Sequence, residues 1–522
     1  MSLIYKHYAH NSSNLYFYDL LGAACGCFIG CVFLNHLKFS SIPIVMGLIA
    51  FSTSLIIKIG FKSKLPTKIL SVLMISILTP LLYFNQQYGI LDHIDKDSGV
   101  TNELWSDWNA YSRIGLLEFQ DPSSDGKYYK FSLDHGSGYA LLKQFNPDVP
   151  FQDRLFENFE ASALGFLMGR PKKILILFAG AGRDMVEAHS YSQGHADITG
   201  IELNPLIIQK AVSLPYFGLN EFFQLPNIHM ISAEGRNFIE TNNHRYDSII
   251  YSWAGSTINN YFGINSNTSQ FLYTQEAFAK LLHRLTPGGT IGIVNGRKLR
   301  VLATFKKAFE EFGVFDISPH VVMFVNNTIR DNLFFNSLLS LGNETRILVK
   351  KTPFTEKDIQ TIQKNLSAMN MHILYAPHIS HKNVTKEQKN IEQILMKIMR
   401  GAHTEEFMRH VSYQTHLDLS PLSDDKPFID NSFNVEALFN VEFWNKLKNQ
   451  YKSIYLNHYF RHFYSIIFIL CIIMLGVLLL LYVIFSQRDR IKISRDAPYI
   501  LLFSTIGLAF IFVEISVLNQ FT

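Results

Sequence analysis

The sequence predicts an α/β protein, in which a doubly wound sheet is preceded by a small β-rich region and flanked by N- and C-terminal transmembrane helices. Three observations indicate this fold class. Long apolar runs lie toward both ends of the 522 residues, short β-rich runs alternate with helix-like stretches between them, and one of these runs ends in a glycine-rich turn. We therefore expect a soluble α/β domain that is anchored in a membrane.

The apolar runs carry almost no charged residues over lengths close to those that cross hydrocarbon. Asp19 precedes the first run and further apolar runs follow it, which favours a membrane anchor over a cleavable signal peptide. Pro80 is expected to bend or shorten the third span. The five expected spans cover residues 20–37, 42–57, 69–84, 465–485 and 498–518.

Composition excludes two other classes of site. The net charge of +4 is too small to indicate nucleic-acid binding. The four cysteines all fall within apolar runs, so neither a disulfide framework nor a zinc site is indicated. We expect no metal site and no nucleic-acid partner.

The polar part of the chain begins with a β-rich region and continues into a sheet. A strand at 128–133 precedes the turn at 135–138, and strand-like runs then alternate with helical stretches of the length that a right-handed crossover requires. The polar stretch 355–409 is expected to be a solvated helical appendage. The expected strands of the sheet are 173–178, 198–202, 228–232, 248–252 and 289–295. The expected regions are 1–84 (membrane), 85–150 (linker and β-rich), 151–350 (sheet domain), 351–464 (helical extension) and 465–522 (membrane).

A glycine turn follows the first strand of the sheet. Gly180 and Gly182 let the backbone approach a ligand and direct unpaired N–H groups at it, and Asp184 begins the next helix. Glu202 ends the following strand, where a carboxylate can accept hydrogen bonds from both hydroxyls of a ribose. These elements together predict a Rossmann-like nucleotide site. The alternatives are an ordinary strand-to-helix turn and a solvated carboxylate.

The next two strand ends add polar residues at the same edge of the sheet. Glu234 and Gly235 follow the third strand and are expected near an adenine, although Glu234 can equally be a helix-start carboxylate. Ser252 and Trp253 follow the fourth strand, where a catalytic acid or base is expected. This position therefore offers hydroxyl and indole groups but no carboxylate.

The chain resembles the spermidine-synthase-like proteins, specifically their membrane-embedded bacterial relatives. The resemblance rests on the shared order of several motifs along most of the chain. They are residues 18–24, 108–114, the Gly180 and Glu202 elements, 272–278, 285–289, 420–428 and 512–515. It implies a Rossmann-like domain of the class I methyltransferase type that binds S-adenosylmethionine or decarboxylated S-adenosylmethionine.

The resemblance also implies a catalytic acid after the fourth strand, which takes a proton from the attacking amine. Ser252 stands there instead, and loss of such a base should cost about two to four orders of magnitude in rate. Asp247 lies near the beginning of its strand, where a structural role is expected. In such proteins Tyr273 faces the substrate pocket, but it can equally be a packed aromatic residue.

Three further elements have two interpretations each. Asp134 and His135 lie where the β-rich region would meet the pocket, but a turn histidine is usually only solvated. Asp424 precedes a segment that lies near the active-site mouth in the family, and the simpler expectation is a loop salt bridge. Glu514, a carboxylate within an apolar span, is either functional or a protonated helix-packing residue.

We therefore predict aminopropyl transfer to an amine, with Ser252 and Tyr273 as the catalytic residues. The substrate would lie near Asp134, His135 and Trp253. A methyltransferase is the first alternative, and a non-catalytic adenosyl-nucleotide sensor or scaffold in a membrane complex is the second. Expected partners are a small amine or membrane-associated acceptor, the lipid bilayer, and an additional membrane subunit or a second copy of the chain.

The expected location is a bacterial inner membrane, but the side of the soluble domain stays open. Lysines crowd the turn before the third span and basic residues crowd the turn at 487–496, which places both turns in the cytoplasm by the positive-inside rule. The soluble domain would then lie outside, away from S-adenosylmethionine. Either the third span does not cross, or the domain does not consume this cofactor, or partner helices set the orientation.

Overall fold

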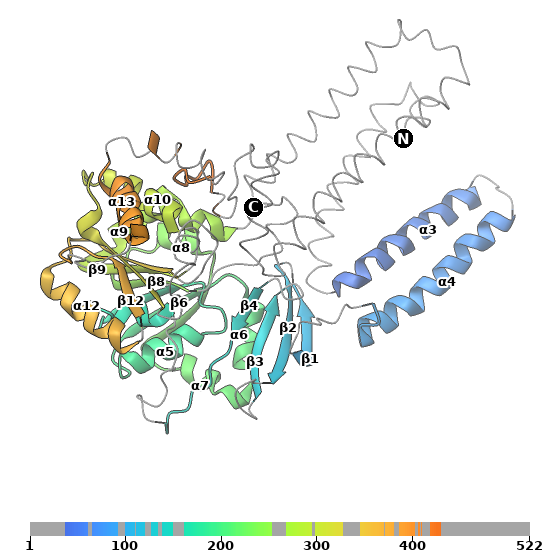
Figure 1. The fold of residues 1–522 in the computed structure, drawn as a ribbon. Coiled ribbons are helices and arrows are strands. Elements are labelled where there is room, and N and C mark those ends of the chain that lie inside the picture. The colour runs from blue at the N-terminus through green and yellow to red at the C-terminus, as the bar shows by residue number, and fades with distance from the viewer. Residues whose placement is uncertain are drawn as a thin grey trace, which may run out of the picture. The chain divides into compact units, whose positions relative to one another are not determined.

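The structure is a computed structural model (Figure 1), and the chain divides into two compact units. One unit comprises Met1–Leu142 with Asn204–Leu214, and the other comprises Lys143–Leu203 with Pro215–Thr522. The described residues are 37–60, 65–91, 100–109, 111–120, 127–133, 138–149, 161–252, 268–294, 298–326, 345–369, 371–379, 386–401, 406–407, 409, 418–427 and 429.

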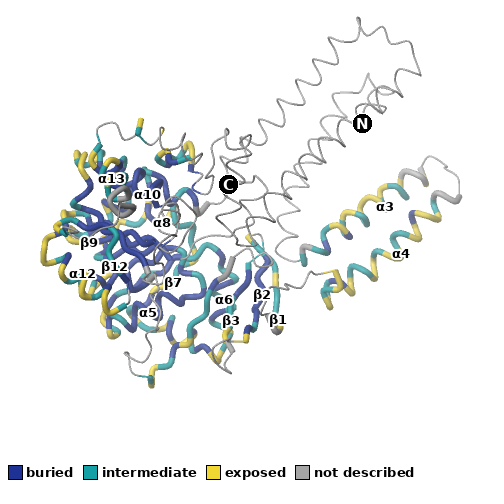
Figure 2. The backbone as a smooth tube through the Cα atoms, in the orientation of Figure 1, coloured by how far each residue is buried: buried dark blue, intermediate teal, exposed yellow. Residues whose placement is uncertain are grey.

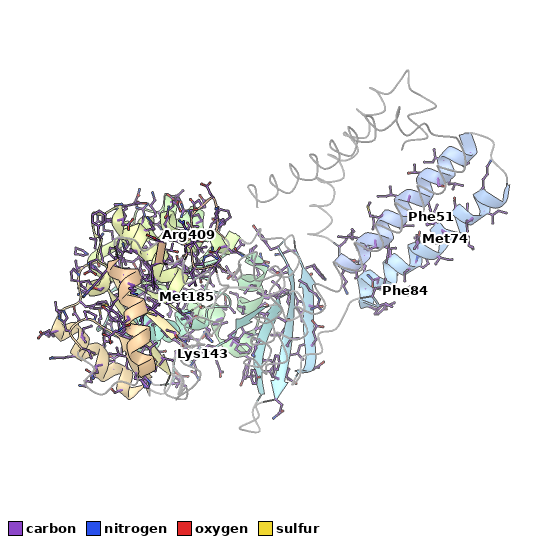
Figure 3. The ribbon with its side chains drawn as sticks, turned by 45° about the horizontal axis from the view of Figure 1, so that its top comes forward. Phe51, Met74, Phe84, Lys143, Met185 and Arg409 are labelled. Carbon is purple, nitrogen blue, oxygen red and sulfur yellow. The ribbon has the colours of Figure 1, made fainter. Side chains whose placement is uncertain are left out.

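Two long apolar helices, α3 (Ile42–Gly60) and α4 (Leu65–Tyr88), lie side by side in the first unit (Figure 1). A buried polar contact ties one end of this pair: the Asn85 amide donates to the hydroxyls of Ser40 and Ser41 at 2.9 Å each. A Cβ on Gly47 would lie 3.0 Å from Leu78, so the helices approach closely there. Figure 3 labels Phe51 on α3 and Met74 and Phe84 on α4.

Much of this helical pair is exposed or only partly buried (Figure 2), and many of its exposed side chains are large and apolar. Those exposed include Met46, Ile49, Ile56, Ile59, Ile69, Leu70, Val72, Leu73 and Ile77. By length and composition, one stretch of the described helices, Lys68–Tyr88, can cross a membrane, and the apolar stretch Ile42–Ile56 is shorter. The expected spans at 465–485 and 498–518, and nearly all of 20–37, lie outside the described residues.

Pro80 does not shorten α4, and the bend that the sequence allows as the alternative stays a prediction. The helix continues past Pro80 to Tyr88 over 24 residues in all. A proline removes one backbone hydrogen bond, and the turns on both sides of it keep theirs.

A four-stranded antiparallel sheet also belongs to the first unit. Its strands are β1 (Val100–Trp108), β2 (Arg113–Gln120), β3 (Lys127–Leu133) and β4 (Gly138–Leu141), and they pair in chain order. Arg113, only 1% exposed, forms an ion pair with Glu103 at 2.6 Å. This arginine is therefore part of the sheet's interior.

An eight-stranded sheet forms the centre of the second unit, in the order β12-β10-β11-β9-β8-β5-β6-β7. The strands are β5 (Lys173–Leu177), β6 (Asp197–Glu202), β7 (Ile228–Ser232), β8 (Tyr246–Tyr251), β9 (Leu285–Ile293), β10 (Val321–Asn326), β11 (Thr345–Lys350) and β12 (Met371–Tyr375). The five strands from β7 to β9 are parallel to one another, and β11, β10 and β12 continue the sheet through antiparallel pairs. The result is a mixed α/β fold around a mostly parallel sheet.

The helices follow the strands along the chain as a doubly wound sheet requires. Those that follow β5 to β11 are α5 (Arg183–Tyr191), α6 (Pro205–Val212), α7 (Leu219–Phe223), α8 (Gly235–Thr241), α9 (Gln275–Arg284), α10 (Lys298–Glu310) and α12 (Glu356–Ala368), and α13 (Lys386–Arg400) follows β12. The α6 residues belong to the first unit, and the other helices in this series belong to the second.

Side chains alternate across the strands, so each face of the large sheet packs against different elements. Leu175, Ile249 and Tyr251 share one buried cluster with residues of α9, α10 and α13. On the other face, Gly200 lies against Met185 of α5 and Gly292 lies against Leu164. Parallel strands covered on both faces explain the continuous apolar run at 174–177.

Two sequence-based expectations differ from this fold. The stretch 355–409 contains a strand, β12, as well as helices α12 and α13, and Ile398 and Met399 of α13 are fully buried. Strand β9 begins at Leu285, before the Pro287–Gly289 turn signal, because Leu285 still pairs with Tyr246 across an irregularity in the register. Local polarity and turn residues do not reveal which residues pair between strands.

Replacing Gly292 by alanine should destabilise the second unit, because the new Cβ would lie 2.7 Å from the Cβ of Leu164. Overpacking of this kind costs about 1–3 kcal/mol. Gly288→Ala in the same strand is the matched control, since no atom lies within 4 Å of its new Cβ. Denaturant unfolding of the purified chain, followed by tryptophan fluorescence, should show the loss for Gly292→Ala only, and equal midpoints would contradict this packing.

Candidate functional site

The carboxyl ends of β5 and β8 mark the point at which the chain reverses its winding direction. From β5 the chain continues to β6 on one side, and β8 later pairs with β5 on the other side. Ligands of doubly wound sheets bind in the crevice outside the strands at such a point. The glycine turn, Glu234 and Ser252 follow strands that end at this edge, and Glu202 is the last residue of β6.

The glycine turn after β5 is held in left-handed backbone conformations. Gly180 has φ 55° and Gly182 has φ 89°. A Cβ on Gly182 would lie 2.7 Å from the ring of Phe223, so no larger residue fits there without movement. Phe178 has φ 61°, which is unusual for a residue with a side chain, and such conformations concentrate at functional sites.

Glu202 lies against this turn and accepts from one of the N–H groups that the sequence predicts to be unpaired. Its Oε2 accepts a hydrogen bond from the Gly180 N–H at 3.0 Å. Its own carbonyl accepts from the Ala233 N–H at 3.0 Å, which connects the ends of β6 and β7. The strand-end carboxylate and the glycine turn are therefore one structural element.

Glu234 caps helix α8. Its two carboxylate oxygens accept from the N–H groups of Arg236 at 2.9 Å and Asn237 at 2.7 Å. This is the helix-start contact that the sequence leaves open, and a role near an adenine stays a prediction. Gly235 begins the helix where a Cβ would lie 2.6 Å from Leu272.

Asp184 and Ser252 meet at this edge, a pairing that the sequence analysis does not predict. The Ser252 hydroxyl donates a hydrogen bond to Oδ2 of Asp184, and Nη2 of Arg183 lies 3.2 Å from Oδ1. Asp184 is 2% exposed and Ser252 5%. A carboxylate thus stands beside the end of β8, supplied by α5. The available signal was that Asp184 opens the helix after β5, the strand next to β8.

Tyr273 packs among aromatic rings. Its ring is stacked with Phe178 at 6.3 Å and contacts Tyr251 at 5.2 Å and Phe278 at 6.4 Å between centroids. Burial, together with the nearby Tyr273, raises the pKa of Tyr251 well above its usual value, and the Tyr251 hydroxyl donates to the Leu272 carbonyl at 2.6 Å. The structure therefore shows the packed-aromatic arrangement, and a direct catalytic role for Tyr273 stays a prediction.

Segment 418–427 is fastened to the helices beside the site. Asp424 forms an ion pair with Arg236 at 3.0 Å and accepts from the Thr274 hydroxyl at 2.6 Å. The Leu422 N–H donates to the buried Thr304 hydroxyl at 3.0 Å. The predicted loop salt bridge of Asp424 is confirmed.

Asp247 has the structural role expected for it. Its Oδ2 accepts from the N–H groups of Lys172 at 3.0 Å and Lys173 at 3.1 Å, and its Oδ1 accepts from the Thr286 hydroxyl at 2.9 Å. These bonds join the beginnings of β5, β8 and β9, at the sheet edge opposite the glycine turn. The other predicted site residues, Asp134, His135, Trp253 and Glu514, lie outside the described residues.

Comparisons with known proteins give structural likenesses only. No family model matches the sequence, and no curated protein matches it. The fold is similar to spermidine synthase from Thermotoga maritima, with 16% identity and a TM-score of 0.35 over 57% of this chain and 89% of that chain. It is also similar to a spermidine synthase in complex with the transition state analogue AdoDATO, with 15% identity and a TM-score of 0.34 over 57% of this chain and 89% of that chain. A probable spermidine synthase from Corynebacterium glutamicum ATCC 13032 has 16% identity and a TM-score of 0.36 over 55% of this chain and 99% of that chain.

The contribution of Asp424 to stability should fall as pH rises. Burial is the main cause that raises its pKa above 3.8, so the folded chain favours the protonated form and loses this contribution as the carboxyl ionises. Because the side chain is 41% exposed, solvent screening should keep the change below about 0.5 kcal/mol. The difference in unfolding free energy between the wild type and Asp424→Asn should shrink from pH 3.5 to pH 6. A difference that grows would mean that the attraction to Arg236 outweighs burial.

Proposed function

We propose that this chain is a membrane-anchored transferase that binds S-adenosylmethionine or its decarboxylated form and transfers an aminopropyl group to an amine. The observation that carries the proposal is the contact between the Glu202 carboxylate and the Gly180 N–H at 3.0 Å. It places a strand-end acid against a glycine turn at the point where the sheet reverses its winding. This is the position in which a carboxylate can receive the two hydroxyls of a ribose.

The residues present fit an adenosyl ligand. Gly180 and Gly182 adopt positive φ values and carry no side chain, which suits a turn whose backbone lies close to a ligand. Glu202 would hold the ribose, and the start of α8 at Gly235 would lie near the adenine. When bound, the ligand supplies a sulfonium carbon that is already activated, so the protein has to align the acceptor and manage its proton.

The carboxylate of Asp184 favours an amine acceptor over the methyl-transfer alternative. A protonated amine cannot attack a sulfonium carbon, and the end of β8 lacks an acid of its own. Asp184 supplies one there through its hydrogen bond with Ser252. The sensor or scaffold alternative requires no such buried pair.

The helical pair α3–α4 supports the anchored part of the proposal. Its outer surface exposes many large apolar side chains, and such patches are rare on soluble monomers. Lipid would cover this surface, and an additional membrane subunit or a second copy of the chain would cover part of it. A membrane position would also suit a membrane-associated acceptor.

Glu202→Ala should weaken binding of the adenosyl ligand by about 1–3 kcal/mol, because charge-assisted hydrogen bonds to the ribose are lost. Asp197→Ala is the matched control: it removes a carboxylate from the opposite end of the same strand, where Asp197 pairs with His229 at 3.0 Å. Calorimetric titration of each purified variant with the adenosyl ligand measures the two affinities. Equal affinities in Glu202→Ala and the wild type would remove the ribose assignment.

The same titration separates the three functions. Tighter binding of decarboxylated S-adenosylmethionine is expected for aminopropyl transfer, and tighter binding of S-adenosylmethionine would indicate methyl transfer. Binding of neither would leave the scaffold alternative.

Ile77→Arg should disturb membrane insertion of α4, because Ile77 is 51% exposed in the middle of the helix and a central arginine costs about 2.5–3.5 kcal/mol. Tyr88→Arg, at the helix end, is the control. Glycosylation tags in 61–64 and 92–99 of the full chain, translated with microsomes, report whether the two ends of α4 lie on opposite sides. If Ile77→Arg leaves the two tags on opposite sides as often as in the wild type, α4 does not span lipid.

A further inference from the structure

The hydrogen bond between Ser252 and Asp184 has a fixed direction. An ionised carboxylate can only accept, so the proton of this bond belongs to the Ser252 hydroxyl. The serine oxygen then keeps lone pairs and has no second proton to donate. Any ligand group that binds this oxygen must therefore be a hydrogen-bond donor, such as an amine N–H.

The carboxylate is built into the site rather than placed loosely at a helix start. Asp184 is 2% exposed, and Arg183 lies 3.2 Å from the carboxylate oxygen that Ser252 does not use. A buried charge needs such a partner to be stable. Arg183 orients one oxygen, so the other stays directed at the serine.

The pair also lies where an acceptor must come. Ser252 directly follows β8, and its N–H donates to the carbonyl of Leu177, the last residue of β5, at 3.1 Å. The two residues thus stand at the carboxyl ends of the two strands that flank the reversal point, at the same edge of the sheet as Glu202, where the adenosyl ligand is proposed.

We propose that Ser252 and Asp184 together form the amine-recognition and proton-accepting group of the transferase, a role that rests on the proposed function. The Ser252 oxygen accepts a hydrogen bond from the N–H of the acceptor amine. Asp184 takes up a proton when the amine loses one. Ser252 is the group that touches the acceptor. Asp184 acts through Ser252, and Arg183 is a positioning residue.

The step balances in atoms and charge. The amine nitrogen forms a bond to the carbon next to the sulfonium, and the carbon–sulfur bond breaks with its electron pair on sulfur, which becomes a neutral thioether. The nitrogen loses one proton to the Ser252 oxygen while the serine proton passes to the Asp184 carboxylate. The products are the alkylated amine, the thioether and a protonated Asp184.

Two probes of equal charge test this role. 1,4-Diaminobutane carries N–H donors, whereas 1,4-bis(trimethylammonio)butane carries the same two charges without them. Each is titrated calorimetrically into the full chain that has first been saturated with 5′-methylthioadenosine, which has no sulfonium group to transfer. We expect the wild type to bind the diamine at least about tenfold more tightly than its quaternary analogue, as for a charge-assisted hydrogen bond.

Variants then test which residues produce this preference for the diamine. Ser252→Ala and Asp184→Asn should lose this preference, and Ser252→Thr should keep it because it keeps the hydroxyl. Ser248→Ala is the matched control, since it removes a buried hydroxyl from β8, the strand that Ser252 follows, where Ser248 lies against Gly165. If Asp184→Asn does not fold because Arg183 loses its partner, Ser252→Ala alone decides.

The outcomes separate this inference from the proposed function. A wild type that binds decarboxylated S-adenosylmethionine but shows no preference for the diamine overturns the inference alone. So does a preference that survives in Ser252→Ala, or one that Ser248→Ala removes equally. A wild type that binds neither S-adenosylmethionine nor its decarboxylated form overturns the proposed function, and the inference with it.

Discussion

The hydrogen bond from the Gly180 N–H to the Glu202 carboxylate is the contact on which the account of this site depends. It connects the turn after β5 to the end of β6. Without it, a glycine turn is only a tight strand-to-helix connection, and a strand-end acid is only a solvated charge. Joined, they hold a carboxylate and a glycine backbone together at the carboxyl edge of the sheet, where ligands of doubly wound sheets bind.

The carboxylates of the large sheet have different roles at the beginnings of the strands and at their carboxyl ends. At the beginnings of the strands, Asp247 accepts three hydrogen bonds and holds β5, β8 and β9 together. At the carboxyl ends, Glu202 and Asp184 each hold one element of the candidate site in place. Glu234 shows an intermediate case, because both of its oxygens cap a helix that begins at the same edge. The same residue type is thus structural or available for chemistry according to its strand position.

Periodicity predicted the sheet domain well where strands are buried and parallel. The run at 228–232 coincides with β7, and the expected strand at 198–202 differs from β6 by one residue. Periodicity failed at the antiparallel edge, because β12 pairs through backbone hydrogen bonds that side-chain polarity does not encode. The candidate site likewise could be predicted only in part. Sequence spacing placed Glu202, but it could not show that Ser252 and Asp184, 68 positions apart, share a hydrogen bond. That contact arises only because β8 pairs with β5.

A structure of the full chain with 5′-methylthioadenosine tests the central claim most directly. This compound carries the ribose that S-adenosylmethionine and its decarboxylated form share, so the result does not depend on which group is transferred. The account predicts that both ribose hydroxyls lie about 3 Å from the Glu202 carboxylate, with the sugar beside Gly180. A ligand bound elsewhere, or a Glu202 side chain turned away from the sugar, would contradict it.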